Sequence, residues 1–311
     1  MTPWPGLAPY GRRMATAGGT ALFLFEAGDK AAPALLLIHG LGDEADSWRH
    51  VFEPLAESHH VIAADLPGFG RSQPIASYRL PVLAHMLLSL LDALNLPTAT
   101  LVGSSMGAML GQLVALRAPE RVAGLVLVDG ALGKPTAPFS WRALRMALPL
   151  LGSRLYTSYR RDARAAYETL RPFYDNLDAL PAADRRFLFQ RVNERVWSDT
   201  QRRAYLRLYR DLAWSEPRRQ GKRSEALGKL AVPTHLIWGE RDRIMPLAAA
   251  NATLGSLPAA WLTMIAGAGH LPHQERPADF LRAVLSPPER QPVGDGQAAI
   301  ESQGADEGQG A

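Results

Sequence analysis

Three residues of the kinds used in nucleophilic catalysis occur along the chain in the order serine, aspartate, histidine. They are Ser105, Asp242 and His270. A serine hydroxyl becomes reactive when a neighbouring base accepts its proton, and histidine is the side chain best suited to this task near neutral pH. A carboxylate bonded to the other ring nitrogen orients the imidazole and stabilises its protonated form. The three residues therefore predict a catalytic triad, with Ser105 as the nucleophile, His270 as the base and Asp242 as the acid that orients the base.

Ser105 occupies the centre of a G-x-S-x-G motif, Gly103–Gly107. The motif follows an apolar segment that predicts a strand, Thr98–Val102, and it opens a predicted helix, Met106–Arg117. A strand–turn–helix of this kind exposes the serine hydroxyl above the sheet and directs the first helical N–H toward the reacting oxygen. We therefore predict the N–H of Met106 as one oxyanion donor. Taken alone, the motif is also typical of a glycine-rich helix start with an exposed serine.

A second glycine-rich turn follows an earlier predicted strand. His39–Gly42 reads H-G-L-G and comes directly after the apolar run Ala34–Ile38. Glycines let a backbone approach a ligand closely, and an N–H in this loop could supply a second oxyanion donor. We assign that role to Leu41. An ordinary strand-to-helix turn would have the same composition.

Two carboxylates follow predicted core strands and compete for the role of the acid. Asp242 comes shortly after the apolar run His235–Trp238, and Asp129 comes directly after Leu125–Val128. Functional sites of open α/β sheets gather at the carboxyl ends of the strands. We favour Asp242, which precedes His270 by 28 positions, although it could instead be a solvated partner of the arginines beside it. Asp129 could cap a turn in a purely structural role.

The sequence before His270 favours it as the base over the other histidines. Gly267 and Gly269 flank a single alanine after the predicted strand Trp261–Ile265, and they let the imidazole reach across the end of the sheet. We expect His235 within a strand and His273 in a loop. Structural or exposed positions are expected for His50, His59, His60 and His85.

Short apolar runs typical of buried parallel strands alternate with helical segments. The predicted strands are 21–26, which belongs to a leading hairpin, 34–38, 61–64, 98–102, 125–128, 235–238 and 261–265. The predicted helices are 47–56, 81–94, 106–117, 247–257 and 277–285. Such alternation requires crossover connections, so we expect an α/β fold whose mostly parallel central sheet has helices on both faces.

One interval interrupts this alternation and divides the predicted core. Residues 132–227 show no clear strand pattern, and their amphipathic helical segments hold 13 of the 24 aromatic residues of the chain. We therefore expect a helical cap inserted between two core strands. The core domain then comprises residues 1–131 and 228–285. Residues 286–311 are poor in apolar side chains and rich in Gly, Gln and Pro, a composition that predicts a disordered tail.

The basic charge of the chain is concentrated in the predicted cap. Residues 135–223 hold 19 Lys and Arg against 9 Asp and Glu, whereas the rest of the chain holds 15 against 21. The arginines alternate with aromatic and aliphatic residues at helical spacing. This pattern favours a solvated helix face over a nucleic-acid surface, so we expect no nucleic-acid partner and mainly exposed arginines.

The composition also excludes several classes of protein. The chain has no cysteine, which excludes disulfides, thiolate catalysis and cysteine-based metal sites. No segment approaches the roughly 20 consecutive apolar residues that a membrane-spanning helix needs. The first residues lack the apolar run of a signal peptide. We therefore expect a cytoplasmic protein without a membrane span, and no pattern specifies an oligomeric state.

Together these motifs make the chain, from about residue 20 to 285, resemble the α/β-hydrolase superfamily. Two further segments share its pattern: Asp65–Ser72 resembles the D-x-P-G-x-G-x-S segment, and His270–Pro277 resembles the G-H-x-P-x-x-E-x-P ending. The order of serine, acid and histidine is also that of this fold. The resemblance implies an α/β-hydrolase fold with a helical cap. It also implies a hydrolase that needs neither a metal nor an organic cofactor.

Within this superfamily the resemblance implies, as the default activity, hydrolysis of a small-molecule carboxylic ester through an acyl-enzyme. Serine at position 105 argues against the dehalogenases and epoxide hydrolases, which place Asp there. The main alternative is a carbon–carbon bond hydrolase of the meta-cleavage type. Those enzymes usually carry Trp after the histidine and often Asn before the nucleophile, whereas this chain has Leu271 and Ser104. An arginine-rich cap could still bind a substrate carboxylate, and a non-enzymatic ligand receptor of the same fold is a third alternative.

Overall fold

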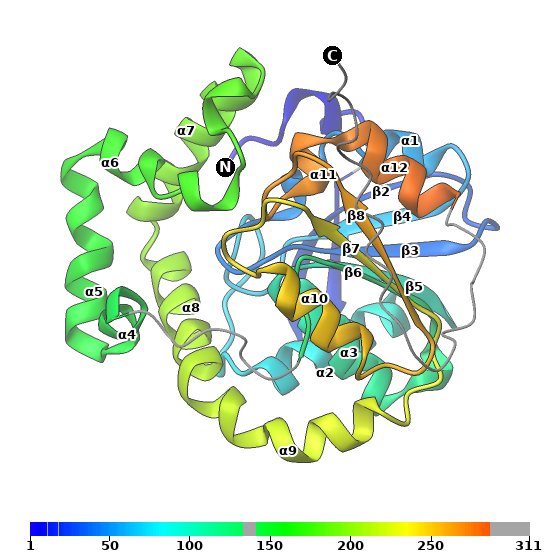
Figure 1. Ribbon diagram of the computed structural model, residues 1–311. Helices are drawn as coiled ribbons and strands as arrows, with labels where there is room; N and C mark the ends of the chain where they lie inside the picture. The colour runs from blue at the N-terminus through cyan, green and yellow to red at the C-terminus, as the bar shows by residue number, and fades with distance from the viewer. Residues whose placement is uncertain (11, 18, 133–140, 287–311) are drawn as a thin grey trace, which may run out of the picture.

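An eight-stranded sheet forms the centre of the protein (Figure 1). The structure is a computed structural model, and it describes residues 1–10, 12–17, 19–132 and 141–286. The predicted disordered tail lies, apart from Ser286, outside the described residues. The strands are β1 (Arg12–Ala17), β2 (Thr20–Ala27), β3 (Ala34–Ile38), β4 (His60–Ala64), β5 (Ala99–Ser104), β6 (Val122–Val128), β7 (Thr234–Gly239) and β8 (Ala260–Ile265), and their order in the sheet is β1-β2-β4-β3-β5-β6-β7-β8.

Six of these strands form a parallel sheet, and two antiparallel strands extend one edge. The pairs from β4 through β3, β5, β6, β7 and β8 are parallel, whereas β2 pairs antiparallel with both β1 and β4. Each predicted apolar run coincides with a strand to within a few residues, and the leading hairpin is β1–β2. Ile38 pairs with Gly103, and Ser104 pairs with Val128. The carboxyl ends of β3, β5 and β6 therefore lie side by side.

Alternate side chains of each central strand enter two different cores. In β3, Leu36 packs in one hydrophobic cluster with helices α2 (Leu80–Ala93), α3 (Met106–Arg117) and α10 (Leu247–Leu254). Its neighbours Leu35 and Leu37 pack in a second cluster with α1 (Phe52–Ala56) and α12 (Pro277–Leu285). The period of two follows from strand geometry and requires both faces of the sheet to be covered. Figure 1 shows α2, α3 and α10 on one side of the sheet and α1 and α12 on the other.

One predicted helix is wrong in its extent. The segment 47–56 is not continuous, because it contains the 3-10 helix Ala45–Trp48, a turn and then α1. Pro54 is the third residue of α1. A proline has no N–H to donate and is tolerated in the first turn of a helix but not in its interior. A helix that started at Ser47 would have placed Pro54 in its interior, so the chain restarts the helix nearer to the proline.

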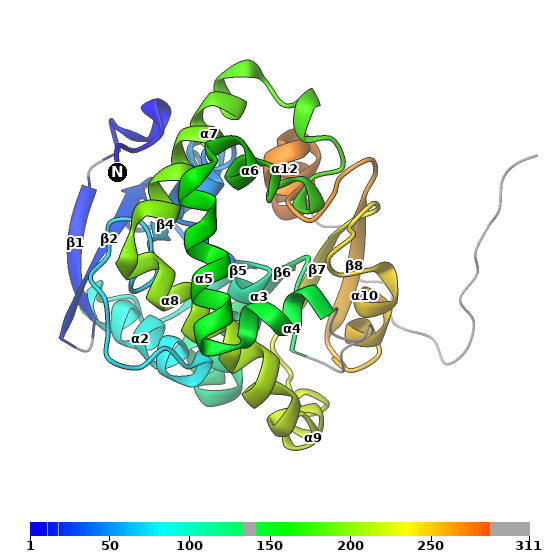
Figure 2. The same ribbon diagram turned by 90° about the vertical axis from the view of Figure 1, so that its left-hand side faces the viewer.

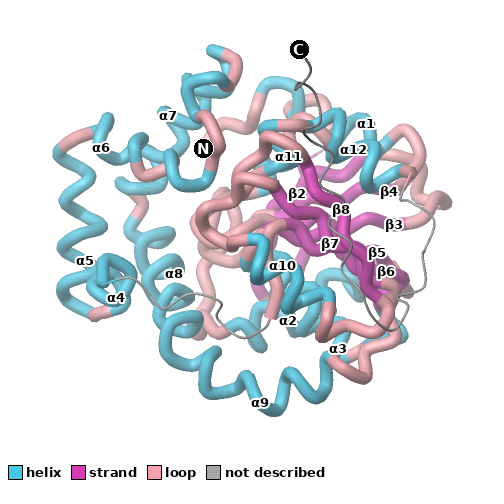
Figure 3. The backbone as a smooth tube through the Cα atoms, in the orientation of Figure 1, coloured by secondary structure: helices cyan, strands magenta, loops and turns pink. Residues whose placement is uncertain are grey.

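Between strands β6 and β7, helices and turns make up the described residues 141–227 (Figures 2 and 3). We call residues 141–227 the helical insertion. Its α-helices are α4 (Trp141–Ala147), α5 (Pro149–Ser158), α6 (Ala163–Glu168), α7 (Ala182–Trp197), α8 (Asp199–Arg210) and α9 (Glu216–Leu227). The structure describes no strand in 141–227, as the sequence predicts, and residues 133–140 of the predicted cap lie outside the described part.

A π-helical turn, Asp211–Ser215, joins α8 to α9 and contacts the core. Asp211 is buried, and its carboxylate accepts a hydrogen bond of 2.9 Å from the N–H of Leu80 at the start of α2. The first N–H groups of a helix have no acceptor within the helix, and a carboxylate there also interacts favourably with the helix dipole. Asp211 therefore fixes the insertion to the core at the N-terminus of α2.

Candidate active site

Ser105 lies at the tight turn between β5 and α3, as the motif predicts. Its backbone has φ 54° and ψ −113°, a region that residues other than glycine rarely adopt. Its N–H donates a hydrogen bond of 2.8 Å to the carbonyl of Val128 on the adjacent strand β6. A Cβ at Gly107 would lie 2.1 Å from the carbonyl oxygen of Ile38. The motif thus needs glycine because α3 begins in direct contact with β3.

The loop that contains Leu41 packs against Ser105. A Cβ built on Gly40 would lie 3.3 Å from the Ser105 Cβ and 4.0 Å from its Oγ. Met106 is the first residue of α3, and the first N–H groups of a helix are free of intrahelical acceptors. The structure therefore brings the loop that contains Leu41 and the first turn of α3, which begins at Met106, next to the serine.

His39 fixes the position of this loop. The ring is fully buried, Nδ1 lies 2.8 Å from the carbonyl of Gly40, and Nε2 accepts a hydrogen bond of 2.9 Å from the N–H of Leu66. These partners assign the neutral tautomer with the proton on Nδ1. Burial lowers the pKa of His39, which agrees with a neutral ring.

The segment that resembles D-x-P-G-x-G-x-S has a structural role. Asp65 is buried and accepts hydrogen bonds from the N–H of Ala45 at 2.8 Å and from the N–H and Nε of Arg71 at 2.7 and 2.8 Å. Ser72 donates to the Asp65 carbonyl at 2.6 Å and accepts from the N–H of Phe23 at 2.8 Å. These bonds tie the loop after β4 to β2 and to the segment after the Leu41 loop.

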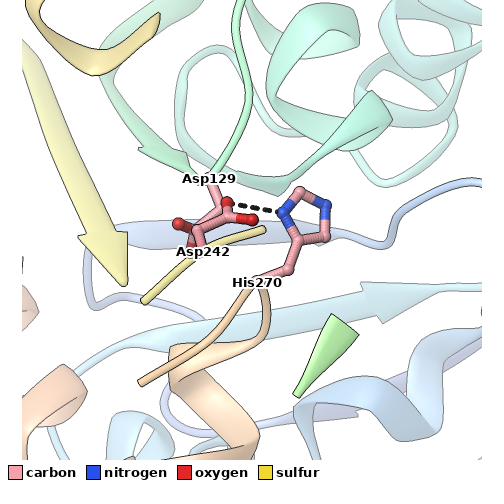
Figure 4. Close-up of side chains that lie close together, drawn as sticks. All are labelled: Asp129, Asp242 and His270. Carbon is pink, nitrogen blue, oxygen red and sulfur yellow. Dashed lines mark hydrogen bonds and ion pairs between the residues drawn. The ribbon is translucent and has the colours of Figure 1, made fainter. Parts of the chain in front are cut away.

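His270 and Asp242 meet across the ends of β7 and β8 (Figure 4). His270 Nδ1 lies 2.7 Å from Asp242 Oδ2, and both side chains are buried. The other oxygen of Asp242 accepts hydrogen bonds from the N–H groups of Ile244 and Met245 at 2.7 and 2.9 Å. His270 Nε2 is buried without a hydrogen-bond partner among the described residues. This arrangement leaves one ring nitrogen for a proton from a nucleophile, while the other is held by a carboxylate.

Asp129, the competing carboxylate, lies in the same cluster but does not hold the histidine. Its Oδ1 accepts a hydrogen bond of 2.8 Å from the N–H of Gly239, and it adopts φ 47° just after β6. Figure 4 shows the side chains of Asp129, Asp242 and His270 pointing toward one another from three different loops. Because Nδ1 of His270 bonds to Asp242, the geometry favours Asp242 as the acid.

The arginines beside Asp242 do not pair with it. Arg241 forms an ion pair of 3.0 Å with Asp175 of the helical insertion, and Arg243 lies 4.0 Å from the same carboxylate. The two arginines thus lie against Asp175 and not against Asp242, so Asp242 is not a surface carboxylate held in an ion pair with its neighbours.

The loop that carries His270 is held by a segment that the sequence did not single out. The N–H of His270 donates a hydrogen bond of 2.9 Å to the carbonyl of Phe173, and the two rings lie 5.7 Å apart. Glu275 accepts hydrogen bonds from Gly269 N–H at 2.7 Å and from Asp175 N–H at 2.8 Å. Glu275 belongs to the motif that begins at His270, and that motif was the only indication of it in the sequence. No local pattern indicated that its hydrogen-bond partners are Gly269 and Asp175.

The expectation for His273 is wrong. It lies not in a loop but on the short helix α11 (Pro272–Glu275), fully buried, with Nε2 3.0 Å from Ser47 Oγ and its ring 4.3 Å from that of Trp48. Burial lowers its pKa to about 3. The motif G-H-x-P turns the chain into a helix directly after His270, and that helix directs His273 into the core.

Two arginines of the insertion point inward and are exceptions to the mainly exposed arginines that the sequence predicts. Arg191 is 2% exposed and lies 2.6 Å from Glu44, while Arg195 lies 2.6 Å from Asp43 and 3.2 Å from Glu44. Both carboxylates follow the Leu41 loop. Burial raises the pKa of Glu44 to about 7 against the opposing charges of Arg195 and Arg191. Both arginines are thus already paired with carboxylates of the core domain, and these ion pairs hold α7 over the Leu41 loop.

Among the described residues, one group could offer ligand atoms for a metal ion: Asp129, Asp242 and His270, with one atom of each within 4.8 Å of the others. The 2.7 Å contact of His270 with Asp242 is a hydrogen bond. Among the described helices, none has the length and apolar character that crossing a membrane requires.

Comparison with known proteins defines the class of this molecule. A family model described as the α/β hydrolase fold matches residues 33–277. The chain therefore belongs to the α/β-hydrolase fold family, and it is a hydrolase.

Individual relatives differ in the reactions for which they are named. The 2-hydroxy-6-oxononadienedioate/2-hydroxy-6-oxononatrienedioate hydrolase 2 of Pseudomonas putida is 30% identical over 269 residues, which cover 82% of this chain and 87% of that protein. The structure of Cfl2 from Burkholderia cenocepacia is 25% identical with a TM-score of 0.77, covering 91% of this chain and 99% of its own. A membrane phospholipase A is 28% identical with a TM-score of 0.72, covering 90% and 86%.

Proposed function

We propose that this α/β hydrolase is a serine hydrolase in which Ser105, His270 and Asp242 form the catalytic triad. The observation that carries the proposal is the buried hydrogen bond from His270 Nδ1 to Asp242 Oδ2, at the same edge of the sheet as a serine held in a strained turn. The bond fixes the tautomer in which Nε2 is free to accept a proton.

The reaction proceeds in two halves. His270 Nε2 accepts the proton of Ser105 as its Oγ attacks the substrate carbonyl, and the N–H groups of Leu41 and Met106 stabilise the resulting oxyanion. His270 then gives the proton to the leaving group, which leaves an acyl-enzyme. Water, deprotonated by the same imidazole, attacks the acyl carbon and releases the acid and Ser105. Asp242 stabilises the imidazolium in both halves.

For the substrate, the comparisons support carbon–carbon bond hydrolysis better than the ester hydrolysis that the sequence favoured. The relative from Pseudomonas putida acts, by its name, on 2-hydroxy-6-oxononadienedioate and 2-hydroxy-6-oxononatrienedioate. We therefore propose a 2-hydroxy-6-oxo dienoate, the type of compound in that relative's name, as the first substrate class to test. In this reaction a carbon–carbon bond breaks in place of the ester C–O bond, its electron pair leaves with the conjugated fragment, and that fragment takes the proton from His270.

Carboxylic-ester hydrolysis is the second candidate, and a specific observation supports it. Leu271 and Ser104 stand where the carbon–carbon hydrolases usually have Trp and often have Asn. The inward-pointing Arg191 and Arg195 are paired with Glu44 and Asp43, so neither is free to bind a substrate carboxylate. The similarity to a phospholipase A also supports an ester substrate.

The helical insertion acts in this proposal as the cap that selects the substrate. It packs over the Leu41 loop through Arg195 and against the His270 loop through Phe173. We further propose that the protein works in the cytoplasm on a small molecule without a metal or organic cofactor.

Turnover assays test the proposal. Purified protein is given a ring-fission dienoate and a panel of 4-nitrophenyl esters of graded acyl length, with Ser105→Ala as the matched variant. We expect turnover to fall by about 10³-fold or more in Ser105→Ala. Equal turnover by both proteins would refute the serine mechanism, whereas binding without turnover on every substrate would favour a receptor. The ratio of kcat/KM values for dienoate and ester decides between the two substrate classes.

A further inference from the structure

Asp129 is a buried carboxyl group beside the proposed triad to which the mechanism gives no role. It follows β6, and Asp242 follows the neighbouring strand β7, so the sheet brings the two side chains together. Asp129 is fully buried and Asp242 is 8% exposed. One side-chain atom from each, with one from His270, lies within 4.8 Å of the other two (Figure 4).

The two carboxyl groups differ in the donors that surround them. Asp242 accepts hydrogen bonds from the N–H groups of Ile244 and Met245 on one oxygen and from His270 on the other. Asp129 accepts from Gly239 N–H on Oδ1, whereas its Oδ2 is buried and accepts no hydrogen bond from the described residues. Hydrogen bonds from described residues therefore stabilise both oxygens of Asp242 as an anion, whereas only one of the two oxygens of Asp129 receives such a bond.

Two carboxylates in one buried site repel each other, so one of them keeps a proton. Burial raises the pKa of Asp129 well above its usual range. The charges of Asp242 and Glu275 raise the pKa of Asp129 further, while the hydrogen bond from Gly239 N–H opposes them. Among the described residues, the titratable groups that act on or lie beside Asp129 include Asp242, Glu275 and His270.

We propose that Asp129 is a positioning residue that remains protonated near neutral pH and donates a hydrogen bond from Oδ2 to the carboxylate of Asp242. The inference rests on the proposed function, because it gives Asp129 a role through Asp242. The neutral acid provides Asp242 with one more donor and ties its loop to β6. It adds no charge, so His270 interacts with one carboxylate charge and not with two.

The Asp129→Asn substitution distinguishes a protonated Asp129 that donates a hydrogen bond to Asp242 from an ionised Asp129 that adds a second negative charge. In the Asp129→Asn variant the amide would keep an oxygen for Gly239 N–H and present an N–H₂ donor to Asp242, as the protonated acid does. We expect Asp129→Asn to retain kcat to within about threefold and to leave the midpoint of the acidic limb of kcat/KM unchanged. Asp129→Ala removes the donor, and we expect kcat to fall by about tenfold or more.

A second measurement does not depend on turnover. The free energy of unfolding is measured by urea denaturation against pH in Ser105→Ala protein, with and without Asp129→Asn. A carboxyl group whose folded-state pKa is raised stabilises the fold below its unfolded-state pKa, and this stability is lost as pH rises toward the folded-state value. From about pH 4 upward, the unfolding constant of the Asp129 protein should rise by up to tenfold per pH unit relative to the Asp129→Asn variant.

Asp184→Asn is the matched control for a buried aspartate. Its carboxylate pairs with Arg49 and His50. Burial raises its pKa, but the hydrogen bond from His50 and the charge of Arg49 outweigh burial and lower it overall. Its contribution to stability is therefore lost as pH falls below about 4, the opposite sign to that of Asp129.

Each outcome decides the proposal. It is overturned if Asp129→Asn lowers the acidic midpoint of kcat/KM by about one pH unit, since this is the effect of removing an anion beside the base. It is also overturned if the stability of the Asp129 protein and of the Asp129→Asn variant varies identically with pH. Should Ser105→Ala retain full turnover, the proposed function fails, and the unfolding titration alone still decides whether Asp129 is protonated.

Discussion

Glu275 accepts a hydrogen bond of 2.7 Å from the N–H of Gly269, the residue before His270. Its other carboxylate oxygen accepts from the N–H of Asp175 in the helical insertion at 2.8 Å. One side chain therefore holds both the proposed base and the segment that packs on it. Burial raises the pKa of Glu275, and the hydrogen bonds from Gly269, Asp175 and Asn176 oppose this shift.

Glu275→Ala is expected to lower kcat by about tenfold or more while the triad residues are all present. The change leaves the N–H groups of Gly269, Asp175 and Asn176 without their acceptor, at about 1–3 kcal/mol for each group that stays buried, and it frees the His270 loop. Steady-state kinetics and the midpoint of thermal unfolding measure the two effects. Glu240→Ala is the matched control, because Glu240 accepts at 3.0 Å from Gly267 N–H in the same loop at an exposed position. A Glu240 variant as impaired as the Glu275 variant would contradict this role.

Asp242→Asn tests which carboxylate orients the base. Asparagine can still accept from the N–H groups of Ile244 and Met245, but its amide N–H₂ then faces His270 Nδ1. The imidazole would have to accept there and carry its proton on Nε2, which is the wrong tautomer for a base. We expect a loss of about 10⁴-fold in kcat near neutral pH, measured on protein whose circular dichroism spectrum is unchanged. A variant with near-normal turnover would remove Asp242 from the triad.

Gly107→Ala is expected to destabilise the turn that holds Ser105. The added methyl group would lie 2.1 Å from the Ile38 carbonyl oxygen and 2.9 Å from that of His39, so α3 would have to move away from β3. We expect a loss of about 2 kcal/mol or more in the free energy of unfolding, together with lost turnover. Gly221→Ala is the control, because Gly221 lies within α9 and, apart from its chain neighbours and the backbone of its own helix, no atom lies within 4 Å of the new Cβ. That variant should be more stable by about 0.5–1 kcal/mol, and the reverse order would be inconsistent with the contacts.

His273 should make the fold sensitive to acid. Burial lowers its pKa to about 3 in the folded state, against about 6.5 in an unfolded chain. A base with a lowered folded-state pKa stabilises the fold fully above about pH 6.5, and this stability is lost as pH falls toward about 3. The unfolding constant should rise by up to tenfold per pH unit over this range, and His273→Gln should remove that part of the rise. Urea denaturation near neutral pH and in mild acid measures the unfolding constant of both proteins. If the constant of the variant rises with acid as much as that of the unchanged protein, groups other than His273 cause the rise.

The fold could be predicted, and a catalytic triad could be proposed, because the signals for both are local. Strands such as Ala34–Ile38 are apolar without interruption, and a strand followed by G-x-S-x-G and a helix identifies the turn at Ser105 from adjacent residues. The order of Ser105, Asp242 and His270 along the chain then agrees with their positions after β5, β7 and β8.

Other parts of the site depend on contacts that no local pattern reports. Asp129 and Asp242 are separated by the whole helical insertion, and only the adjacency of β6 and β7 brings them together. The carbonyl of Phe173 holds the His270 N–H by its backbone, so its side-chain identity gives no indication of the contact. The arginines of the insertion follow a pattern typical of a solvated face, yet two of them pair with the buried carboxylate of Glu44 and the partly buried carboxylate of Asp43.

Arg195→Gln distinguishes a structural arginine from one that binds the substrate. The guanidinium is paired with Asp43 at 2.6 Å and Glu44 at 3.2 Å, and removing one partner of a buried ion pair costs about 3–5 kcal/mol because it leaves an unpaired charge. We expect the free energy of unfolding to fall accordingly. We also expect kcat/KM to fall by the same factor for a dienoate carboxylate and for an uncharged ester, because Arg195 acts through the Leu41 loop and not on the substrate. A substrate-binding arginine would instead raise KM for the carboxylate alone.

Arg203→Gln on the exposed face of α8 is the control and should leave the turnover of both substrates unaffected. A loss confined to the dienoate in Arg195→Gln would show that the arginine leaves its carboxylate partners to bind the substrate, and it would strengthen the case for an acidic substrate.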